Sequence, residues 1–488
     1  MLANALDWIE ANIPAWVYIT VIAHLSILGA VAYLILLERK IASWVQDRIG
    51  PNRVGLGFGI IPFLKDLHMF GLGQPLADGL KFILKEDYRP KHVDKILFTL
   101  APMIMITTVI ISIAVLPWGG VKQSTKVIDV TGVPTAQVES AVKEKLPSNA
   151  RSIVISNVHT EKAVTEDGVL ISPEKTTATA TYNWNFQIAN LNIGVLFILA
   201  VLSLAVYGVV IGGWASNNKY SFLGGLRATA NMISYEIPLG LAVLAIVVMF
   251  GTLELDVLVA KQAHLWWGFI PAWNIFTQPL AFVMFLICIH AEANRAPFDL
   301  AECEQELVGG YHTEYSAMRF ALFFLAEYAG MITTSAVCVA LFFGGWHLPG
   351  LTGNVDPTHP EITTSLLMCV LRAAVFFGKT LAIIFVFMWV RWSLPRFRFD
   401  QLMMLAWRAL IPMSLAMLVM TAICVYWTHG ASYSGLDGRT GARFVLGNVV
   451  LMVLFLITSL LIPAAPETNR RMKIPGSRFN KTALPASI

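Results

Sequence analysis

Long apolar runs alternate with short polar segments along most of the chain. Each run is about 20 residues long, the length at which an α-helix rising ~1.5 Å per residue crosses a ~30 Å hydrocarbon layer. Lipid satisfies no backbone hydrogen bond, and the runs lack the alternation of barrel strands, so helices are required. The pattern predicts nine spans, at about 15–37, 96–117, 191–213, 233–252, 273–291, 318–343, 373–391, 408–427 and 445–463.

The composition agrees with a membrane as the main solvent. Of the 488 residues, 56% are hydrophobic and only 14% are charged, whereas soluble globular proteins carry about 25% charged residues. The sequence therefore predicts an all-α polytopic membrane protein. The net charge of +4 follows from the topology, and no nucleic-acid binding is indicated.

The positions of lysine and arginine predict the orientation. Ten of them lie between residues 38 and 95, directly after the first span, and the positive-inside rule places such a loop in the cytoplasm. Alternation then makes the N-terminus external and the tail at 464–488, which carries five basic residues, cytoplasmic. No basic residue precedes the first span, so we expect an uncleaved anchor there and not a signal peptide.

The spans divide the chain into four parts. Residues 1–117 hold the first two spans and a cytoplasmic loop, and residues 118–190 form a polar insert on the external side. Residues 191–463 form a seven-span bundle that includes an acidic cytoplasmic loop at 292–317. Residues 464–488 form the basic tail.

The first cytoplasmic loop contains the stretch "QPLADGLKFILKE". Its Leu76, Leu80, Ile83 and Leu84 share one helical face. Pro75 suits a first helical position, because its missing N–H is not needed there. The stretch predicts an amphipathic helix in the cytoplasmic surface of the membrane.

The insert at 118–190 has mixed periodicity. Apolar residues recur at helical spacing in 135–146, whereas 152–158 and 176–184 are rich in residues that favour strands. We therefore expect a small extracytoplasmic α+β unit, or else an ordered lid that needs a partner.

The cysteines and histidines argue against a resident metal or haem. The five cysteines form no CxxC pair, and iron–sulfur clusters and structural zinc need grouped thiolates. His24 is the only histidine in the middle of a predicted span, so the facing pair that a membrane haem requires is missing. We expect no metal site and no cofactor held by this chain.

The stretch "EANRAPFDLAECEQELVGGYHTEY" holds six carboxylates and one arginine between two apolar spans. A plain hydrated loop is the simplest interpretation. Pro297, Gly309 and Gly310 interrupt any continuous helix, while apolar side chains allow the loop to fold against the bundle. Because crowding and burial raise carboxylate pKa values, such groups can titrate near neutral pH, as a proton relay requires.

Ionisable residues also occur within the apolar segments themselves. Glu236 lies near the start of the fourth predicted span, Glu327 within the sixth and Lys379 within the seventh. A charge at the bilayer centre costs ~2.5 to 3.5 kcal/mol on insertion scales, so such residues usually face a wet interior or a partner.

Several motifs together carry a family resemblance. They are "ERK" at 38–40, "RIGPNRVG" at 48–55, "QPLADGLK" at 74–81, "GWASNNKYSFLGGLRA" at 213–228, "ISYE", the acidic stretch, "LAEY" and "LPRFRFDQLM" at 394–403. In this order the chain resembles the quinone-chamber subunits, called H, in the membrane arm of the proton-pumping NADH:quinone oxidoreductase, respiratory complex I.

The resemblance implies a subunit without redox groups in a proton-translocating enzyme of the bacterial cytoplasmic (inner) membrane. Quinone would be the substrate, and FMN and iron–sulfur clusters would belong to partner subunits of the peripheral arm. Other membrane-arm subunits and lipid would surround the chain.

The resemblance also implies roles for residues at matching positions. The entrance for quinone would be lined by Arg39, Arg48, Asp78 and Lys81. The quinone chamber and its acidic loop would include Arg295, Phe298, Asp299, Glu302, Glu304 and Glu306. The segment that faces them would include Arg396, Arg398 and Asp400. A hydrated proton path would involve Tyr235, Glu236, Glu292, Glu314, Glu327 and Lys379.

The chain also departs from the family pattern. Residues 56–73 add a segment before the surface helix, the insert at 118–190 is unusually long, and Ser203 stands where some relatives have an acid. From the residues alone, two other classes stay open: a cation/proton transporter whose buried acids bind an ion, and a membrane anchor subunit, as in a related hydrogenase-type complex.

Overall fold

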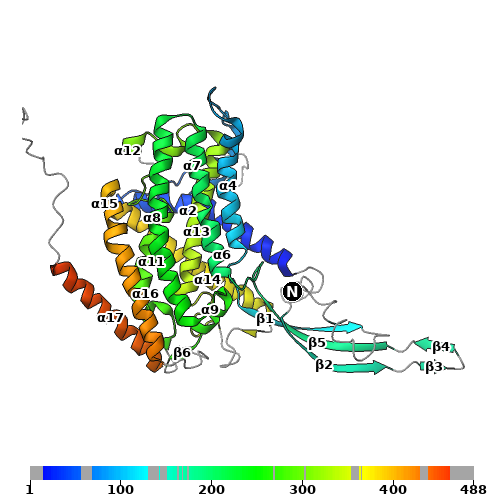
Figure 1. The fold of residues 1–488 in the computed structure, drawn as a ribbon. Helices are drawn as coiled ribbons and strands as arrows, with labels where there is room; N and C mark the ends of the chain where they lie inside the picture. Colours follow the sequence, from blue (N-terminus) through cyan, green and yellow to red (C-terminus); the bar gives the residue numbers. More distant parts are fainter. Residues whose placement is uncertain are drawn as a thin grey trace, which may run out of the picture.

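The computed structural model describes residues 15–55, 69–129, 142, 151–161, 164–166, 169–172, 175–266, 270–301, 304–352, 362–363, 365–428 and 438–461. Most of these residues form a bundle of long helices, with a small sheet at one end (Figure 1).

The helices follow one another along the bundle. They are α2 (Ala15–Val45), α3 (Gln74–Leu84), α4 (Lys95–Ile113), α6 (Gly194–Ser203), α7 (Ala205–Ala215), α8 (Lys219–Phe250), α9 (Leu255–Gln262), α10 (Asn274–Thr277), α11 (Pro279–Glu292), α12 (Glu304–Leu307), α13 (Ala317–Phe342), α14 (Leu366–Ser393), α15 (Phe399–Met404), α16 (Ile411–Trp427) and α17 (Gly438–Leu461). Short 3-10 turns η2 (Met69–Gly71) and η4 (Gly310–His312) and a π-helical turn η5 (Leu405–Leu410) complete the set.

Seven helices among the described residues are long and apolar enough to cross a membrane. They cover Lys95–Ile113, Gly194–Ala215, Lys219–Phe250, Ala317–Phe342, Leu366–Ser393, Phe399–Trp427 and Thr440–Leu460. The chain is thus a multi-pass helical membrane protein, as the hydropathy pattern predicts. The first predicted span corresponds to α2, a helix of 31 residues that crosses the bundle obliquely (Figure 1).

The fifth predicted span, 273–291, is not one continuous helix. It consists of the four-residue α10 and the 14-residue α11, which meet at Gln278. Pro279 opens α11 at a position where its missing N–H needs no partner, and Gln278 before it leaves the helical conformation with φ −131° and ψ 57°. At ~1.5 Å per residue α11 is only about 21 Å long, shorter than a ~30 Å hydrocarbon layer.

Buried amides satisfy the polar groups around this break. The Asn274 side chain donates to the Leu341 carbonyl at 2.7 Å, and the Asn448 side chain donates to the Thr277 carbonyl at 2.9 Å. Gln278 donates to Thr421 Oγ1 at 3.3 Å. These contacts fasten α10 and α11 to the helices around them.

The fourth predicted span begins earlier than expected. Helix α8 starts at Lys219 and not near residue 233, because Asn218 caps it by accepting from the Tyr220 N–H at 2.9 Å. Glu236 therefore lies 17 residues, about 25 Å, inside the helix and not near its start.

Both strands predicted in the insert are confirmed. They are β2 (Arg151–Glu161) and β5 (Lys175–Asn185), and β1 (Val121–Asp129) joins them in a sheet of order β2-β5-β1-β8. The helix predicted over 135–146 lies outside the described residues except for Val142.

The sheet runs antiparallel except at its last strand. In β1 and β5, Val121 is opposite Asn185. The short β8 (Ile362–Thr363) adds in parallel from the loop before α14. Two further hairpins are β3 (Val164–Glu166) with β4 (Val169–Ser172) and β6 (Leu265–Trp266) with β7 (Ile270–Pro271).

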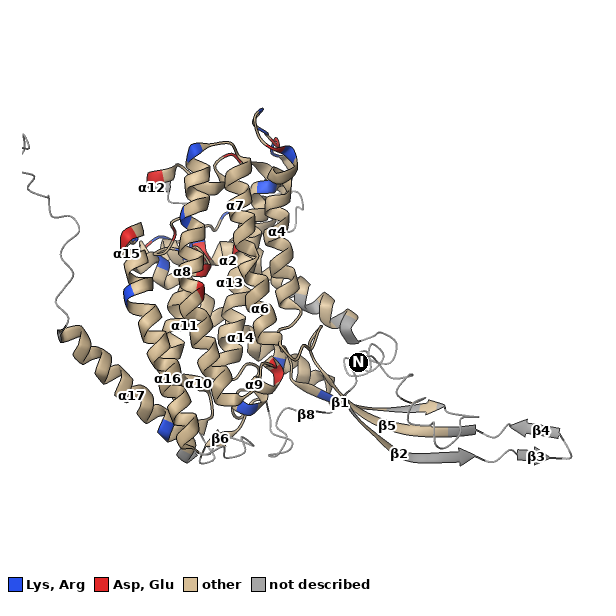
Figure 2. Cartoon of the chain, in the orientation of Figure 1, with Lys and Arg blue, Asp and Glu red and all other residues tan. Residues whose placement is uncertain are grey.

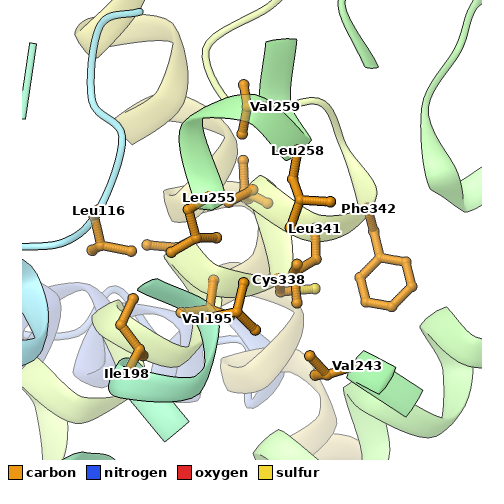
Figure 3. Close-up of a cluster of buried hydrophobic side chains, with 14 of the residues drawn as sticks. Leu116, Val195, Ile198, Val243, Leu255, Leu258, Val259, Cys338, Leu341 and Phe342 are labelled. Carbon is orange, nitrogen blue, oxygen red and sulfur yellow. The ribbon is translucent and has the colours of Figure 1, made fainter. Parts of the chain in front are cut away.

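The sheet is joined firmly to one end of the bundle, opposite α12 (Figure 1). Trp184 and Phe186 are buried, and Trp118 makes an edge-to-face contact with Phe376 of α14. Figure 3 shows the apolar core nearby, where side chains of α6, α8, α9 and α13 such as Val195, Leu258 and Phe342 converge.

Close helix packing depends on glycine at several positions. A Cβ on Gly213 of α7 would lie 2.6 Å from the backbone oxygen of Ser221 in α8, whereas a Cβ on Gly240 would have no neighbour within 4 Å. The first site therefore has no room for a side chain and the second has ample room.

We predict that Gly213→Ala lowers the thermal midpoint of the purified protein, because α7 and α8 must move apart at a cost of about 1 to 3 kcal/mol. Gly240→Ala is the matched control and should stabilise the helix by up to about 1 kcal/mol through propensity alone. Equal midpoints for the two variants would show that the packing at Gly213 is not tight.

Candidate functional site

A large cavity of about 670 Å³ lies where α2, α3, α13 and α14 meet, and we term it the inner cavity. Ionisable side chains from every one of these helices and from the acidic loop contribute to its wall: Glu38, Arg39, Asp78, Lys81, Lys85, Arg295, Tyr328 and Arg391. Such a concentration of charge is unusual within a membrane bundle and marks a candidate site.

A smaller cavity of about 240 Å³, the outer cavity, lies between α2, α3 and α13. Its wall is almost wholly apolar, and among the described residues that line it only Gln74 and Asp78 have polar side chains. The two cavities therefore offer different environments side by side: one suits a polar group and the other a hydrocarbon chain.

Glu38 is the centre of a buried ionic cluster in the wall of the inner cavity. Only 6% of its surface is exposed. It pairs with Arg391 and accepts a hydrogen bond from the Tyr328 hydroxyl. Arg295 Nη1 lies 3.9 Å from Glu38 Oε1, and the Arg295 guanidinium lies 4.2 Å from the centre of the Tyr328 ring. Two arginines thus offset the cost of burying this carboxylate.

Arg295 also reaches a second buried carboxylate. Its Nη2 lies 3.9 Å from Glu327 Oε2, and the Tyr311 hydroxyl donates to Glu327 Oε1 at 2.6 Å. Glu327 is 8% exposed and lies on α13, whereas Glu38 lies on α2. One guanidinium therefore stands between a carboxylate of the cavity wall and a carboxylate further inside the bundle.

A third cavity, of about 50 Å³, lies on the interior side of Glu327. Glu292, Glu327, Asn294 and Thr334 supply its polar lining. A cavity needs only about 10 to 15 Å³ to hold one water, so a few water molecules fit here with polar partners. Water in this cavity would join the carboxylates of Glu292 and Glu327.

Glu236 extends this series of acids. Its carboxylate is close enough to Glu292 for the two to interact electrostatically, and the Ser203 side chain is a polar neighbour of it. The Ser203 hydroxyl is also 3.0 Å from the Leu199 carbonyl oxygen. Figure 2 shows acidic residues within the bundle near α8 and α13, away from its ends.

The acidic loop is fastened to its surroundings at three points. Arg396 donates to Asp299 at 2.7 Å, Arg227 pairs with Glu306 at 2.6 Å, and Asn218 donates to Glu314 at 2.6 Å. The structure thus brings Asp299 and Arg396 together, as the family resemblance implied.

Aromatic packing against α8 also holds the acidic loop. The ring of Phe298 makes an edge-to-face contact with Tyr235, at 5.5 Å between centres, and Tyr235 donates to the Leu402 carbonyl at 3.0 Å. Tyr235 therefore serves the packing of the loop, while its neighbour Glu236 belongs to the series of acids.

Other predicted site residues lie apart from the cavities. Arg48, Arg398 and Asp400 are exposed and do not line the inner cavity. Glu304 begins α12, and Glu302 lies outside the described residues. Arg39 and Asp78, in contrast, form an ion pair of 2.9 Å at the edge of the inner cavity.

Lys379 is separate from the acids that were expected to share a path with it. Its Nζ donates to the carbonyls of Phe343, Gly345 and His347 at 2.7, 3.0 and 2.6 Å, and lies 4.4 Å from the centre of the Trp273 ring. Phe343 follows Glu327 by 16 residues, about 24 Å of helix. Lys379 thus caps the far end of α13.

The sequence interpretation missed four residues of the ionic cluster: Glu38, Tyr311, Tyr328 and Arg391. Glu38 and Arg391 occur at the ends of predicted spans, where charged side chains usually extend into the membrane–water interface. Nothing in the sequence around either residue therefore indicates that the two form a buried pair. Tyr328 directly follows Glu327 in "LAEY", which was the available clue. Among the described residues no group of three His, Cys, Asp or Glu could hold a metal ion.

Comparisons with known proteins agree on one family. The model of the NADH dehydrogenase family matches residues 18–142 and 168–422. The H subunit of NADH-quinone oxidoreductase from Leptospira biflexa is 42% identical over 429 residues, covering 87% of this chain and 98% of that protein.

Two further relatives carry similar names. The first of the H subunits of NADH-quinone oxidoreductase in Cytophaga hutchinsonii is 39% identical over 86% of this chain and 98% of its own length. The corresponding protein of Geobacter sulfurreducens is 38% identical over 85% and 97%. The stretch that the family model leaves unmatched between its two segments, 143–167, lies within the insert.

We predict that Lys379→Met lowers the stability of the purified protein by about 3 kcal/mol, because three carbonyls lose a charged donor. Lys379→Arg, which keeps a cationic donor, should lose less than half of that. Thermal unfolding followed by tryptophan fluorescence measures both, and equal stability of Lys379→Met and the wild type would contradict the capping role.

Proposed function

The chain belongs to the family of H subunits of NADH-quinone oxidoreductase, and we propose that its inner cavity receives the head of a membrane quinone. It is thereby a multi-pass membrane subunit of that oxidoreductase, and the other subunits of the complex are its partners. In the proposal, the acids behind Arg295 couple quinone reduction to proton translocation.

The two adjoining cavities support the quinone part of the proposal. A quinone combines a polar head with a long isoprenoid tail. The apolar outer cavity suits the tail, and the inner cavity offers the N–H donors of Arg39 and Lys81 to the carbonyl oxygens of the head. Ligand sites in proteins commonly combine an apolar wall with a few convergent polar groups.

The position of Arg295 is the single observation that carries the coupling part. Reduction of the head to a quinol takes up two electrons, which partner subunits would deliver from FMN through iron–sulfur clusters, and two protons. Anionic charge that forms in the inner cavity during this step competes for Arg295 with Glu38 and Glu327. Any loss of the guanidinium from Glu327 favours protonation of that carboxylate.

The third cavity, of about 50 Å³, then provides a route for proton transfer away from Glu327. Water beside Glu327 leads to Glu292, and Glu292 interacts with Glu236 in the middle of α8. A proton taken up at one carboxylate changes the affinity of the next, because charges a few ångströms apart in a poorly solvated site interact strongly. Lys379 is not needed for this route.

The proposed topology fits this arrangement. With the N-terminus external and the basic tail cytoplasmic, the acidic loop and the inner cavity face the cytoplasm, where the peripheral arm would dock. The amphipathic α3, which has no buried residue and exposes Leu76, Ile83 and Leu84, would lie in the cytoplasmic surface of the membrane at the mouth of the cavities.

A photoreactive quinone tests the binding site. After illumination of the purified complex, we expect labelled peptides from α2, α3 and α13 around Glu38, Phe82 and Phe324, and loss of labelling when natural quinone competes. Labels confined to α16 and α17 would show that the quinone binds elsewhere.

Neutral variants test the coupling. We expect Glu292→Gln and Glu327→Gln to reduce proton translocation about a hundredfold or more, as loss of a general acid–base group does, while NADH oxidation by a soluble acceptor persists. Glu254→Gln, at the opposite end of the bundle before α9, is the control and should leave translocation intact. Normal translocation in both Glu292 and Glu327 variants would rule out the proposed route.

A further inference from the structure

The inner and outer cavities share four lining residues. They are Ile35 of α2, Asp78 and Phe82 of α3, and Phe324 of α13. A residue that lines two neighbouring cavities stands between them. The three apolar members, Ile35, Phe82 and Phe324, therefore form a partition to which each of the three helices contributes one side chain.

The two phenylalanines of the partition belong to an aromatic row. Phe82 lies 6.3 Å from Phe320, and Phe320 lies 4.6 Å from Phe324, measured between ring centres. The rings of Phe320 and Phe324 also contact His312 of η4 at 5.2 and 6.0 Å. Through Phe320 and Phe324, the partition thus packs against His312 at the end of the acidic loop.

Helix α3 is held at both ends, which limits how the partition can open. Before the helix, Gly71 has φ +85° and packs against the Pro51 carbonyl, and the Gly73 N–H donates to the Val54 carbonyl at 3.3 Å. Just after the helix, the Tyr88 N–H donates to Ser316 Oγ at 3.0 Å. A swing of the whole helix would break these anchors at both ends.

The side chains of the partition have more freedom than the backbone that carries them. Ile35, Phe82 and Phe324 are all half-buried, and α3 contributes no fully buried residue. Rotation of the two phenylalanine rings would open a passage without moving a helix. Asp78, paired with Arg39 at 2.9 Å, supplies the one polar edge of that passage among the described residues.

We infer that the partition of Ile35, Phe82 and Phe324 determines which quinone heads can pass from the outer to the inner cavity. This inference rests on the proposed function. The tail remains in the outer cavity after the head has passed, so the partition closes on the flexible tail and not on the rigid rings. Selection by head width occurs at this position, before any contact with the ionic cluster.

The test compares two quinones that have the same tail. One has a single-ring benzoquinone head, and the other has a two-ring naphthoquinone head. For the purified complex, kcat/KM with NADH is measured for each quinone, and their ratio reports selectivity by head width. The variants are Phe82→Ala with Phe324→Ala, which widens the partition, and Phe82→Trp, which narrows it. Leu325→Ala with Met318→Ala is the matched control, because both residues line the outer cavity only.

We expect the ratio of two-ring to one-ring kcat/KM to differ by about fivefold or more between the widened and the narrowed variant, since steric discrimination by a pocket reaches at least this size. The control should change KM for both quinones alike and leave the ratio within about twofold of wild type. NADH oxidation by a soluble acceptor shows that each variant has assembled.

The outcomes separate this inference from the function on which it rests. If the ratio stays constant in all variants while KM changes for both quinones, the cavities bind quinone but the partition does not select. If KM stays at the wild-type value for both quinones in every variant, including the control, the cavities do not receive quinone at all, and the proposed function is overturned.

Discussion

Arg295 compensates two buried carboxylates at once, and the arrangement of the rest of the site depends on this. Neither lipid nor apolar side chains can solvate Glu38 or Glu327, so each needs a cation or donor nearby. Glu38 has Arg391 and Tyr328 in addition, while Tyr311 donates to Glu327. Because the guanidinium is 3.9 Å from both acids, a third anion in the inner cavity would compete for the same cation.

The geometry around this arginine is set by elements that meet only in three dimensions. Glu38 ends the apolar part of α2, Glu327 lies in α13, and Arg391 lies in the last turn of α14. The acidic loop brings Arg295 between them, and the contacts of Phe298, Asp299 and Glu314 fasten that loop. Rigid helices thus provide the acids, and a loop provides the cation that connects them.

Much of this could be predicted from the sequence, and the limits have physical causes. Hydropathy identifies long spans because lipid demands about 20 apolar residues in succession. It failed at residues 273–291, where buried amides satisfy a break that composition does not reveal. Glu236 and Glu327 were recognised individually as costly charges. Glu38 was missed, and its partners Tyr328 and Arg391 lie 290 and 353 residues further along the chain. No local pattern encodes such pairings.

Lys379 shows why a charge within a span does not by itself indicate a proton path. Placing the Lys379 charge within a span is costly, but here three backbone carbonyls and a tryptophan ring contact the ammonium group and offset that cost. These carbonyls belong to the turn directly after α13, where the negative end of the helix dipole also favours a cation. Glu292 and Glu327 differ because they line a cavity that can hold water. The decisive property of a buried charge is therefore whether its partner can exchange a proton, and backbone carbonyls cannot.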